Sequence, residues 1–308
     1  MERRALAAVA VTLLVWSSAF AGIRAGLRAY SPGHLLLARF LVASAAMGAY
    51  AWVARIPLPP RHLWGRLCLL GWLGITFYMS ALTFGERTVP AAPAGFVVAS
   101  SPVVSALLAL AFLGERLGPR AVAGILLGLV GEGVIALGAG PVGRLGAGMA
   151  LVAAAAVATA AFFVAEKPLL VRHPPAHVTA WVTWAGTLPF LVFLPGLVRQ
   201  VEVAPAAATA AVVYLGAVPA ALGYVTWGYA LSRLPTHRAM SFLYLNPVLA
   251  AAIAWVWLGE RPGWATWVGG AAVLAGVALV QGRQRAPRAE AVAPGGDLAP
   301  PAASGSRS

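Results

Sequence analysis

Few residues of this chain could do chemistry, and most of them are polar side chains inside long apolar runs. Asn246 and Ser101 each directly precede a proline inside such a run. A proline within a helix removes one backbone N–H and frees a carbonyl in the preceding turn. Broken backbone of this kind is tolerated in a membrane only inside protein or beside a cavity. We therefore interpret Tyr244 and Asn246, with Ser100 and Ser101 opposite them, as lining the path of a solute. Polar contacts between packed helices are the alternative.

Charged side chains within the apolar runs are a second group of candidates. Arg39 lies in the run 34–54, and a charge at the bilayer centre costs about 3 kcal/mol, so it should face protein or water. Arg39 would hold an anionic group of a substrate or, alternatively, extend to the nearer interface. Glu132, between two glycines, could exchange a proton and couple transport to a gradient. The alternative for Glu132 is a carboxyl with hydrogen-bond partners or at the lipid edge. For Glu166 we expect an ion pair with its neighbour Lys167 at the membrane interface.

Four aromatic residues, Trp16, Tyr78, Tyr224 and Trp227, lie deep within apolar runs. They could form the walls of a mostly apolar pocket with few polar groups. Packing as ordinary helix-filling core is the alternative.

The sequence gives little support for an enzymatic function. His173 and His177 have a metal-like spacing, but the two prolines between them prevent the helix that would align them. The sole aspartate, Asp297, lies in the C-terminal tail, and no G-x-x-x-x-G-K-[ST] motif is present. We expect no catalytic residues, no metal site and no cofactor.

The composition indicates a membrane protein. Of the 308 residues, 60% are hydrophobic and 10% are charged, whereas soluble domains carry roughly a quarter charged residues. The net charge of +13 raises the possibility of nucleic-acid binding. However, the basic residues fall between apolar runs, as is typical of membrane proteins. The expected partners are a small-molecule solute and the lipid bilayer, with no nucleic acid.

Ten apolar segments have the length of a membrane-spanning helix, which needs roughly 20 residues. The segments are 5–23, 34–54, 66–85, 91–113, 119–138, 147–165, 177–197, 206–231, 236–258 and 263–281. Strands of a membrane barrel are about half as long and alternate in polarity, so the fold class is all-α. The first segment could pass for a signal peptide, but we predict a retained helix because its apolar run is long.

The chain contains an internal repeat. Ser101-Pro102 to Gly114-Glu115-Arg116 is echoed by Asn246-Pro247 to Gly259-Glu260-Arg261, and the offset is 145 at both ends (247 − 102 and 260 − 115). Shared proline, glycine and Glu-Arg positions are hard to obtain by chance, so the chain is read as two copies of one unit. We predict a first repeat at 1–140, a second at 141–282 and a disordered cytoplasmic tail at 283–308.

The distribution of Lys and Arg predicts the orientation. With a cytoplasmic N-terminus, the inner segments hold 15 of these residues and the outer segments 6, which favours both termini inside. Five spans per copy is an odd number, so the second copy would enter the membrane inverted. Inverted repeats are a recurring plan of secondary transporters, with the substrate bound near the midplane.

A Pro-led helix that closes on Leu-Gly-Glu-Arg in each half, at Leu113–Arg116 and Leu258–Arg261, resembles the EamA-type branch of the drug/metabolite transporter superfamily. The run from His34 to Arg39-Phe40 is similar to the second helix of that family. This resemblance covers about residues 5–283. It implies a ten-helix inner-membrane carrier of small metabolites, often an exporter.

We therefore expect a secondary active transporter that moves an amino acid or related metabolite outward across the cell inner membrane by alternating access. An integral-membrane channel or an assembly factor without carrier activity is the alternative. Gly124-x-x-x-Gly128 and Gly22-x-x-x-Gly26 permit close helix contact, which makes a homodimer possible.

Overall fold

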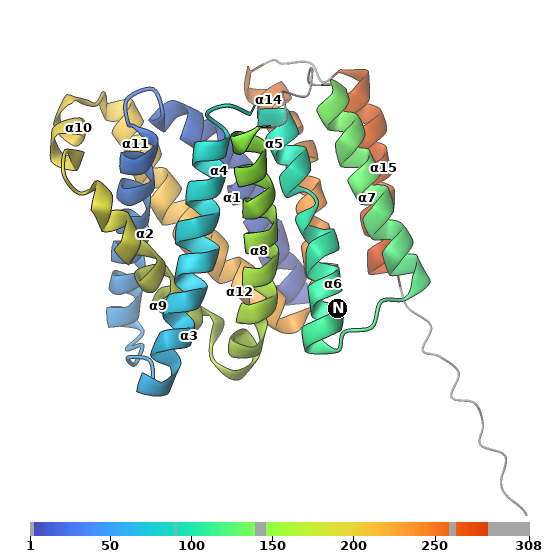
Figure 1. Cartoon of the computed structure of the whole chain (residues 1–308), viewed down its shortest axis with the longest axis horizontal. Coiled ribbons are helices and arrows are strands. Elements are labelled where there is room, and N and C mark those ends of the chain that lie inside the picture. The colour runs from blue at the N-terminus through green and yellow to red at the C-terminus, as the bar shows by residue number, and fades with distance from the viewer. Residues whose placement is uncertain (1–2, 90, 139–145, 259–262, 283–308) are drawn as a thin grey trace, which may run out of the picture.

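The computed structural model describes residues 3–89, 91–138, 146–258 and 263–282, and within these ranges the regular structure is entirely helical. The helices stand side by side in one bundle (Figure 1). The first half comprises α1 (Arg3–Gly26), α2 (Pro32–Val53), η1 (Arg61–Leu63), α3 (Trp64–Gly71), η2 (Trp72–Phe77), α4 (Tyr78–Gly85), α5 (Ala91–Val98), α6 (Ser101–Leu113) and α7 (Pro119–Gly138). The second half comprises α8 (Ala147–Arg172), α9 (Pro175–Thr187), η3 (Leu188–Phe193), α10 (Leu197–Val203), α11 (Ala206–Leu215), η4 (Gly216–Leu222), α12 (Gly223–Arg233), α13 (Thr236–Ser241), η5 (Phe242–Tyr244), α14 (Leu245–Leu258) and α15 (Trp264–Gln281).

Eight stretches of the described helices are long and apolar enough to cross a membrane. They are Pro32–Val53, Arg61–Gly85, Ala94–Leu113, Pro119–Gly138, Ala147–Arg172, Pro175–Phe193, Ala206–Arg233 and Trp264–Gln281. The predicted spans 5–23 and 236–258 are not among the eight; the first lies in α1, and the second is divided into α13, η5 and α14. The predicted disordered tail, 283–308, lies outside the described residues.

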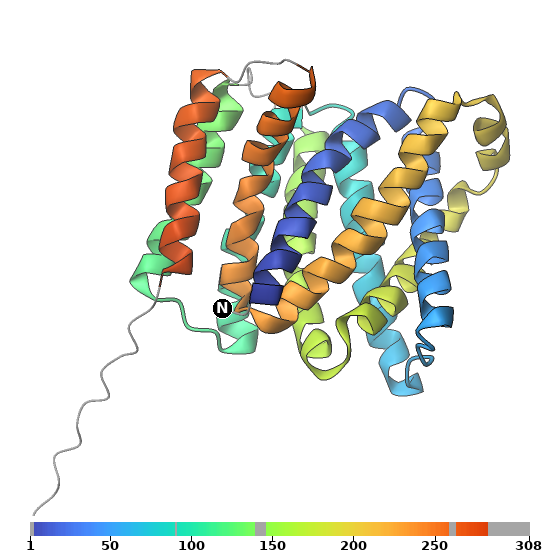
Figure 2. The ribbon, with the colours of Figure 1, turned by 180° about the vertical axis from the view of Figure 1, so that it is seen from behind.

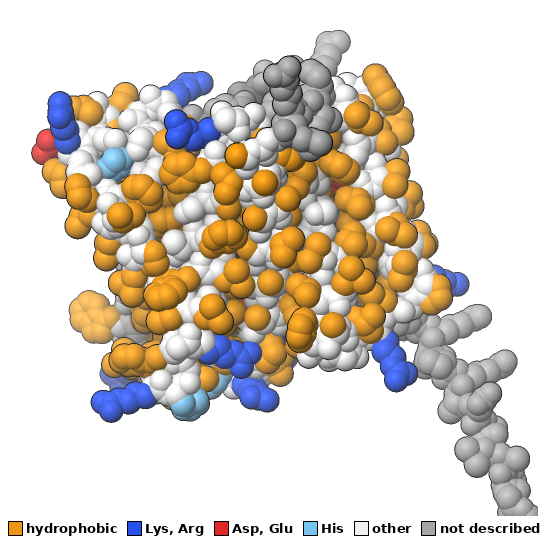
Figure 3. Space-filling model, viewed as in Figure 1, with side chains coloured by type: hydrophobic (Ala, Val, Ile, Leu, Met, Phe, Trp, Pro, Cys, Tyr) orange, Lys and Arg blue, Asp and Glu red, His pale blue; other side chains and the backbone are white. Residues whose placement is uncertain are grey.

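The surface of the bundle suits a lipid environment. Apolar side chains cover the middle of the face seen in Figure 3, and Lys and Arg side chains gather near its upper and lower ends. Trp52 is 85% exposed and Phe112 is 77% exposed. Exposed apolar groups of this size are stable only in contact with apolar surroundings.

Two long helices are interrupted by π-helical turns at matching places. The segment η2 separates α3 from α4, and η4 separates α11 from α12. With the offset of 145, Trp72 corresponds to Ala217 and Phe77 to Leu222, so the two π segments occupy the same place in each repeat. Short π segments inside α-helices occur frequently at functional sites. The sequence repeat did not predict these interruptions.

A second pair of breaks also matches between the halves. The chain leaves α5 after Val98 and begins α6 at Ser101. In the other half, the 3-10 turn η5 separates α13 from α14, which begins at Leu245. Both breaks come just before a proline, as expected from the lost backbone N–H.

Glycines bring α7 and α15 into direct backbone contact, and these two helices lie side by side in both views (Figures 1 and 2). A Cβ atom on Gly124 would come within 2.5 Å of the Gly276 carbonyl oxygen, and one on Gly131 within 2.6 Å of that of Gly269. Glycine is the residue that permits such an approach. Gly128 faces the Tyr244 ring and Gly22 faces Leu215. The glycines that suggested a homodimer therefore serve contacts within the chain, and the dimer stays a prediction.

Candidate functional site

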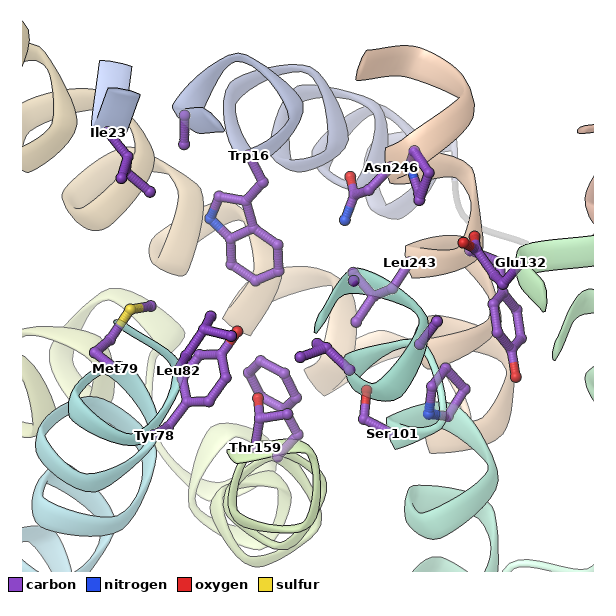
Figure 4. Close-up of a pocket in the computed structure, with 18 of the residues that line it drawn as sticks. Trp16, Ile23, Tyr78, Met79, Leu82, Ser101, Glu132, Thr159, Leu243 and Asn246 are labelled. Carbon is purple, nitrogen blue, oxygen red and sulfur yellow. The ribbon is translucent and has the colours of Figure 1, made fainter. Parts of the chain in front are cut away.

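A cavity lies inside the bundle, where the breaks in α5–α6 and α13–α14 and the two tyrosines that follow the π segments meet. Its lining comprises Trp16, Ala19, Ile23, Arg39, Tyr78, Met79, Leu82, Glu86, Gly95, Val98, Ala99, Ser101, Pro102, Glu132, Thr159, Phe163, Tyr224, Leu243, Tyr244, Asn246 and Pro247. In Figure 4, Trp16, Thr159, Ser101 and Asn246 surround a common space, with Tyr78 and Glu132 on opposite sides of it. The lining is mostly apolar with few polar groups, as in a small-molecule site.

Most of the residues that the sequence predicted for a substrate path line this cavity. They are Trp16, Arg39, Tyr78, Ser101, Tyr224, Tyr244 and Asn246, and the coupling candidate Glu132 lines it too. Ser100 and Trp227 do not. The Ser100 hydroxyl donates a hydrogen bond back to the carbonyl of Val97 at 2.7 Å. The Trp227 ring is 1% exposed and packs against Trp16, so it supports the wall from behind.

One wall of the cavity is an aromatic cluster centred on Trp16 of α1. The Trp16 ring stacks on Phe163 with the centroids 6.4 Å apart, and meets the Tyr224 ring edge-on at 5.5 Å. Its indole Nε1 donates a hydrogen bond of 3.0 Å to the carbonyl of Pro219 in η4. This bond joins α1 to a π segment and fixes the orientation of the indole.

Asn246 combines the two roles weighed for it. The residue lines the cavity, and the Ser17 hydroxyl of α1 donates to its side-chain oxygen at 3.2 Å. The same hydroxyl lies 3.3 Å from the Asn246 backbone carbonyl oxygen. The Asn246 side chain is therefore held against α1 while it borders the cavity.

The two buried charges in the lining have few partners. Arg39 is 4% exposed, so its side chain does not extend to the surface, and its Nε atom has no hydrogen-bond partner. Glu132 is 2% exposed, and its Oε1 atom also lacks a partner. Glu132 is therefore neither at the lipid edge nor fully hydrogen-bonded. Buried polar groups without partners are uncommon, and each asks for an explanation.

Thr159, Phe163 and Glu86 are among the lining residues that were not predicted as site residues from the sequence. Thr159 and Phe163 lie four residues apart on α8, so they share one helix face. Glu86 follows the end of α4 and is exposed, and nothing in the sequence distinguished it from an ordinary helix-end carboxylate.

A cluster of ionic and polar groups closes one end of the bundle, away from the cavity. Lys167 Nζ forms an ion pair with Glu115 Oε1 at 2.5 Å and donates to the Leu234 carbonyl at 2.8 Å. The backbone N–H of Thr236 donates to Glu115 Oε2 at 2.7 Å, its hydroxyl donates to Oε1 at 2.9 Å, and His237 Nδ1 lies 3.4 Å from Oε2. We call Glu115, Lys167, Thr236 and His237 the Glu115 cluster.

The Glu115 cluster joins the end of α6 to α8 and to the start of α13. Gly114 makes this possible, because its φ of 65° ends α6 in the left-handed conformation and turns the chain aside. Burial tends to raise the pKa of Glu115, but His237, Lys167 and Thr236 outweigh it and lower this pKa to about 2. The expected Glu166–Lys167 pair is not formed, because adjacent residues point to different sides of a helix and Lys167 pairs with Glu115.

Comparison with known proteins gives consistent matches over the described bundle. The model of the EamA-like transporter family matches residues 3–137 and again 146–281. A probable terminal-alkyne amino-acid exporter of Streptantibioticus cattleyicolor is 41% identical over 95% of this chain and 98% of its own length. A probable amino-acid metabolite efflux pump of Escherichia coli is 28% identical over 85% of this chain and 89% of its own. A solved crystal structure with 24% sequence identity shares the fold with a TM-score of 0.75, covering 90% of this chain and 96% of that one.

Proposed function

The chain belongs to the EamA-like transporter family and is a multi-pass solute transporter, and we propose that it exports an amino acid or a related metabolite across the cell inner membrane. The names of two relatives, an amino-acid exporter and an amino-acid metabolite efflux pump, support this substrate class and direction.

The cavity shared by both halves is the observation that carries the proposal. Trp16, Tyr78 and Ser101 contribute from the first half, and Tyr224 and Asn246 from the second. A mostly apolar site with a few polar groups, between two halves of a helical bundle, suits a small amphipathic solute. The solute would bind at this seam and be released when the halves move relative to each other.

The proposal includes ten membrane spans arranged as two inverted repeats, 1–140 and 141–282. The glycine contacts support it: Gly124 meets Gly276 and Gly131 meets Gly269, while the offset of 145 relates Gly124 to Gly269 and Gly131 to Gly276. Contacts that exchange in this way are what a two-fold axis between the repeats would produce. The matching π segments are a second support, and α6 and α14 end at opposite edges of the bundle (Figure 1).

Alternating access is the mechanism we propose, with the Glu115 cluster as the closed gate. The cluster lies at the edge where α6 ends, whereas the cavity includes Glu86 beyond the end of α4, at the opposite edge. The repeat partners of Thr236 and His237 are Ala91 and Ala92, which have no side-chain donors. The positive-inside rule supports a cytoplasmic N-terminus, so the cluster would face the cytoplasm and the cavity the outside.

Transport by the purified full chain in proteoliposomes tests the proposal. Uptake or efflux of amino acids and simple carboxylic metabolites should saturate with solute concentration, with and without an imposed proton gradient. Saturation separates a carrier from a channel. If no solute of the panel moves in any gradient, the proposed substrate class is wrong.

A further inference from the structure

Arg39 is a buried cation without an internal counter-ion. The guanidinium is 4% exposed, and no ion pair or side-chain hydrogen bond of Arg39 is found among the described residues. Its guanidinium carbon lies 5.5 Å from the centroid of the Phe40 ring. The side chain borders the cavity.

The backbone of α2 holds Arg39 in this place. Gly216, at the start of the π segment η4, packs so closely that a Cβ atom there would come within 2.5 Å of the Arg39 carbonyl oxygen. The helix therefore cannot rotate to carry the guanidinium to the lipid–water interface without losing this contact. A buried charge is costly unless it is paired and hydrogen-bonded. The missing partner must come from the cavity.

Tyr78 and Tyr224 line the same cavity as Arg39. Tyr78 directly follows the π segment η2, and Tyr224 lies two residues after the end of η4. Neither hydroxyl takes part in a hydrogen bond among the described residues, so both can donate into the cavity. A guanidinium and two phenolic hydroxyls that line one cavity are groups that can donate hydrogen bonds to an anion.

We propose that Arg39, assisted by Tyr78 and Tyr224, binds the carboxylate of the transported molecule. This inference rests on the proposed function and deepens it. The planar guanidinium fork matches a carboxylate in a two-bond geometry, and the apolar part of the solute would lie against Trp16 and Phe163. Glu132 lies across the cavity from Tyr78 (Figure 4) and is not part of this carboxylate site. In this proposal the carboxylate, and not the amino group, is the charge that Arg39 selects.

A substrate series on the full chain in proteoliposomes tests this selection. The probes are leucine, norvaline and phenylalanine, each with its N-acetyl derivative and its carboxamide. We expect the acids and their N-acetyl derivatives to compete for transport, and the carboxamides to compete at least about tenfold more weakly, because they lack the charge that a guanidinium prefers. Carboxamides that compete as well as the acids would overturn the inference.

Variants of Arg39 provide the second arm. Arg39→Gln should weaken transport of the acids by at least about tenfold, and Arg39→Lys should weaken it less. Arg28→Gln is the matched control, since Arg28 is exposed in the turn after α1. Unchanged transport of the acids by Arg39→Gln would overturn the inference. If Arg39→Gln does not fold, the double variant Tyr78→Phe and Tyr224→Phe keeps the charge and should still lower transport several-fold. Unchanged transport by this double variant would equally contradict the site.

A failure of the proposed function looks different. In that case the wild-type chain transports none of the acids, and both the proposed function and the carboxylate site are wrong. When the wild type moves acids and carboxamides equally well, the transporter function stands and only the role of Arg39 is lost.

Discussion

Two cations in the membrane-spanning helices, the partly buried Lys167 and the buried Arg39, have opposite surroundings. Lys167 has three partners: the Glu115 carboxylate, the Leu234 carbonyl and the Thr236 hydroxyl at 3.2 Å. Arg39 has none among the described residues. Both lie on membrane-spanning helices, where an unpaired charge is costly. The comparison teaches that a charge with a full set of partners holds helices together, whereas a charge without partners beside a cavity is available to a ligand, as we propose for Arg39.

The largest expected effect is a difference in the sign of two stability changes. Lys167→Met should lower thermal stability by about 2 to 3 kcal/mol, because it removes a charged donor from the partly buried Glu115. Arg39→Met should raise the stability of the ligand-free protein by about 1 to 3 kcal/mol, because it removes an unpaired charge. Thermal unfolding in detergent measures both, with Arg28→Met as the exposed control. Similar losses in the two variants would break the comparison.

The pH dependence of the paired site sharpens the comparison. The pKa of Glu115 is lowered from 4.5 to about 2, so its contribution to stability is fully present above the unfolded value of 4.5. The contribution is lost as the pH falls through about 2. Stability measured from pH 7 to pH 2 should therefore decline below about 4.5 in the wild type. Glu115→Gln should show a smaller decline in that window, and an equal decline would remove Glu115 as its source.

Glu132 extends the comparison to an unpaired anion. We propose that it binds the exchanged proton, as its cavity position and partnerless Oε1 suggest. Glu132→Gln should then abolish the acceleration of transport by an imposed proton gradient and leave solute exchange intact. The measurement is counterflow beside gradient-driven transport in the same proteoliposomes. A variant that still responds to the gradient at the wild-type level would exclude Glu132 as the coupling group.

The smallest effect is expected at Asn246, which is neutral and partly partnered. Asn246→Ala should lower transport about threefold to tenfold, because a single hydrogen bond in a membrane protein contributes roughly 0.6 to 1.7 kcal/mol. Expression level and specific activity are measured separately. Ser17→Ala is the matched control, because it removes the hydrogen bond between α1 and Asn246 but leaves the Asn246 side chain in place. Lost expression with normal specific activity would assign Asn246 to helix packing.

The sequence predicted the helices well because each span is read from local composition. The predicted run 34–54 corresponds to Pro32–Val53, and 119–138 corresponds to Pro119–Gly138. Turn residues also act locally, as Gly114 does at the end of α6. The π segments were missed because the extra residue of a π turn leaves an apolar run unchanged in composition.

The site was predicted only in part, because partners come from segments far apart in the chain. Arg39 and Glu132 were identified as charges inside apolar runs, but sequence reasoning favoured the nearer interface for Arg39 and a hydrogen-bonded or lipid-edge carboxyl for Glu132, not the cavity. Lys167 was assigned to its neighbour Glu166, whereas its true partner Glu115 lies 52 residues away. Closeness along the chain predicts the partner of a charged side chain poorly, because whole helices pack together and bring distant residues into contact.

By itself, the sequence determined that this chain consists of long apolar helices in two related copies, because composition and a repeat offset are properties of the chain alone. The tertiary structure decided which charges have partners. Whether a cation such as Lys167 finds a carboxylate, or one such as Arg39 is left facing a cavity, depends on how the helices are rotated and packed against one another. That rotation is fixed by contacts such as those at Gly216 and Gly124, which only the folded bundle brings together.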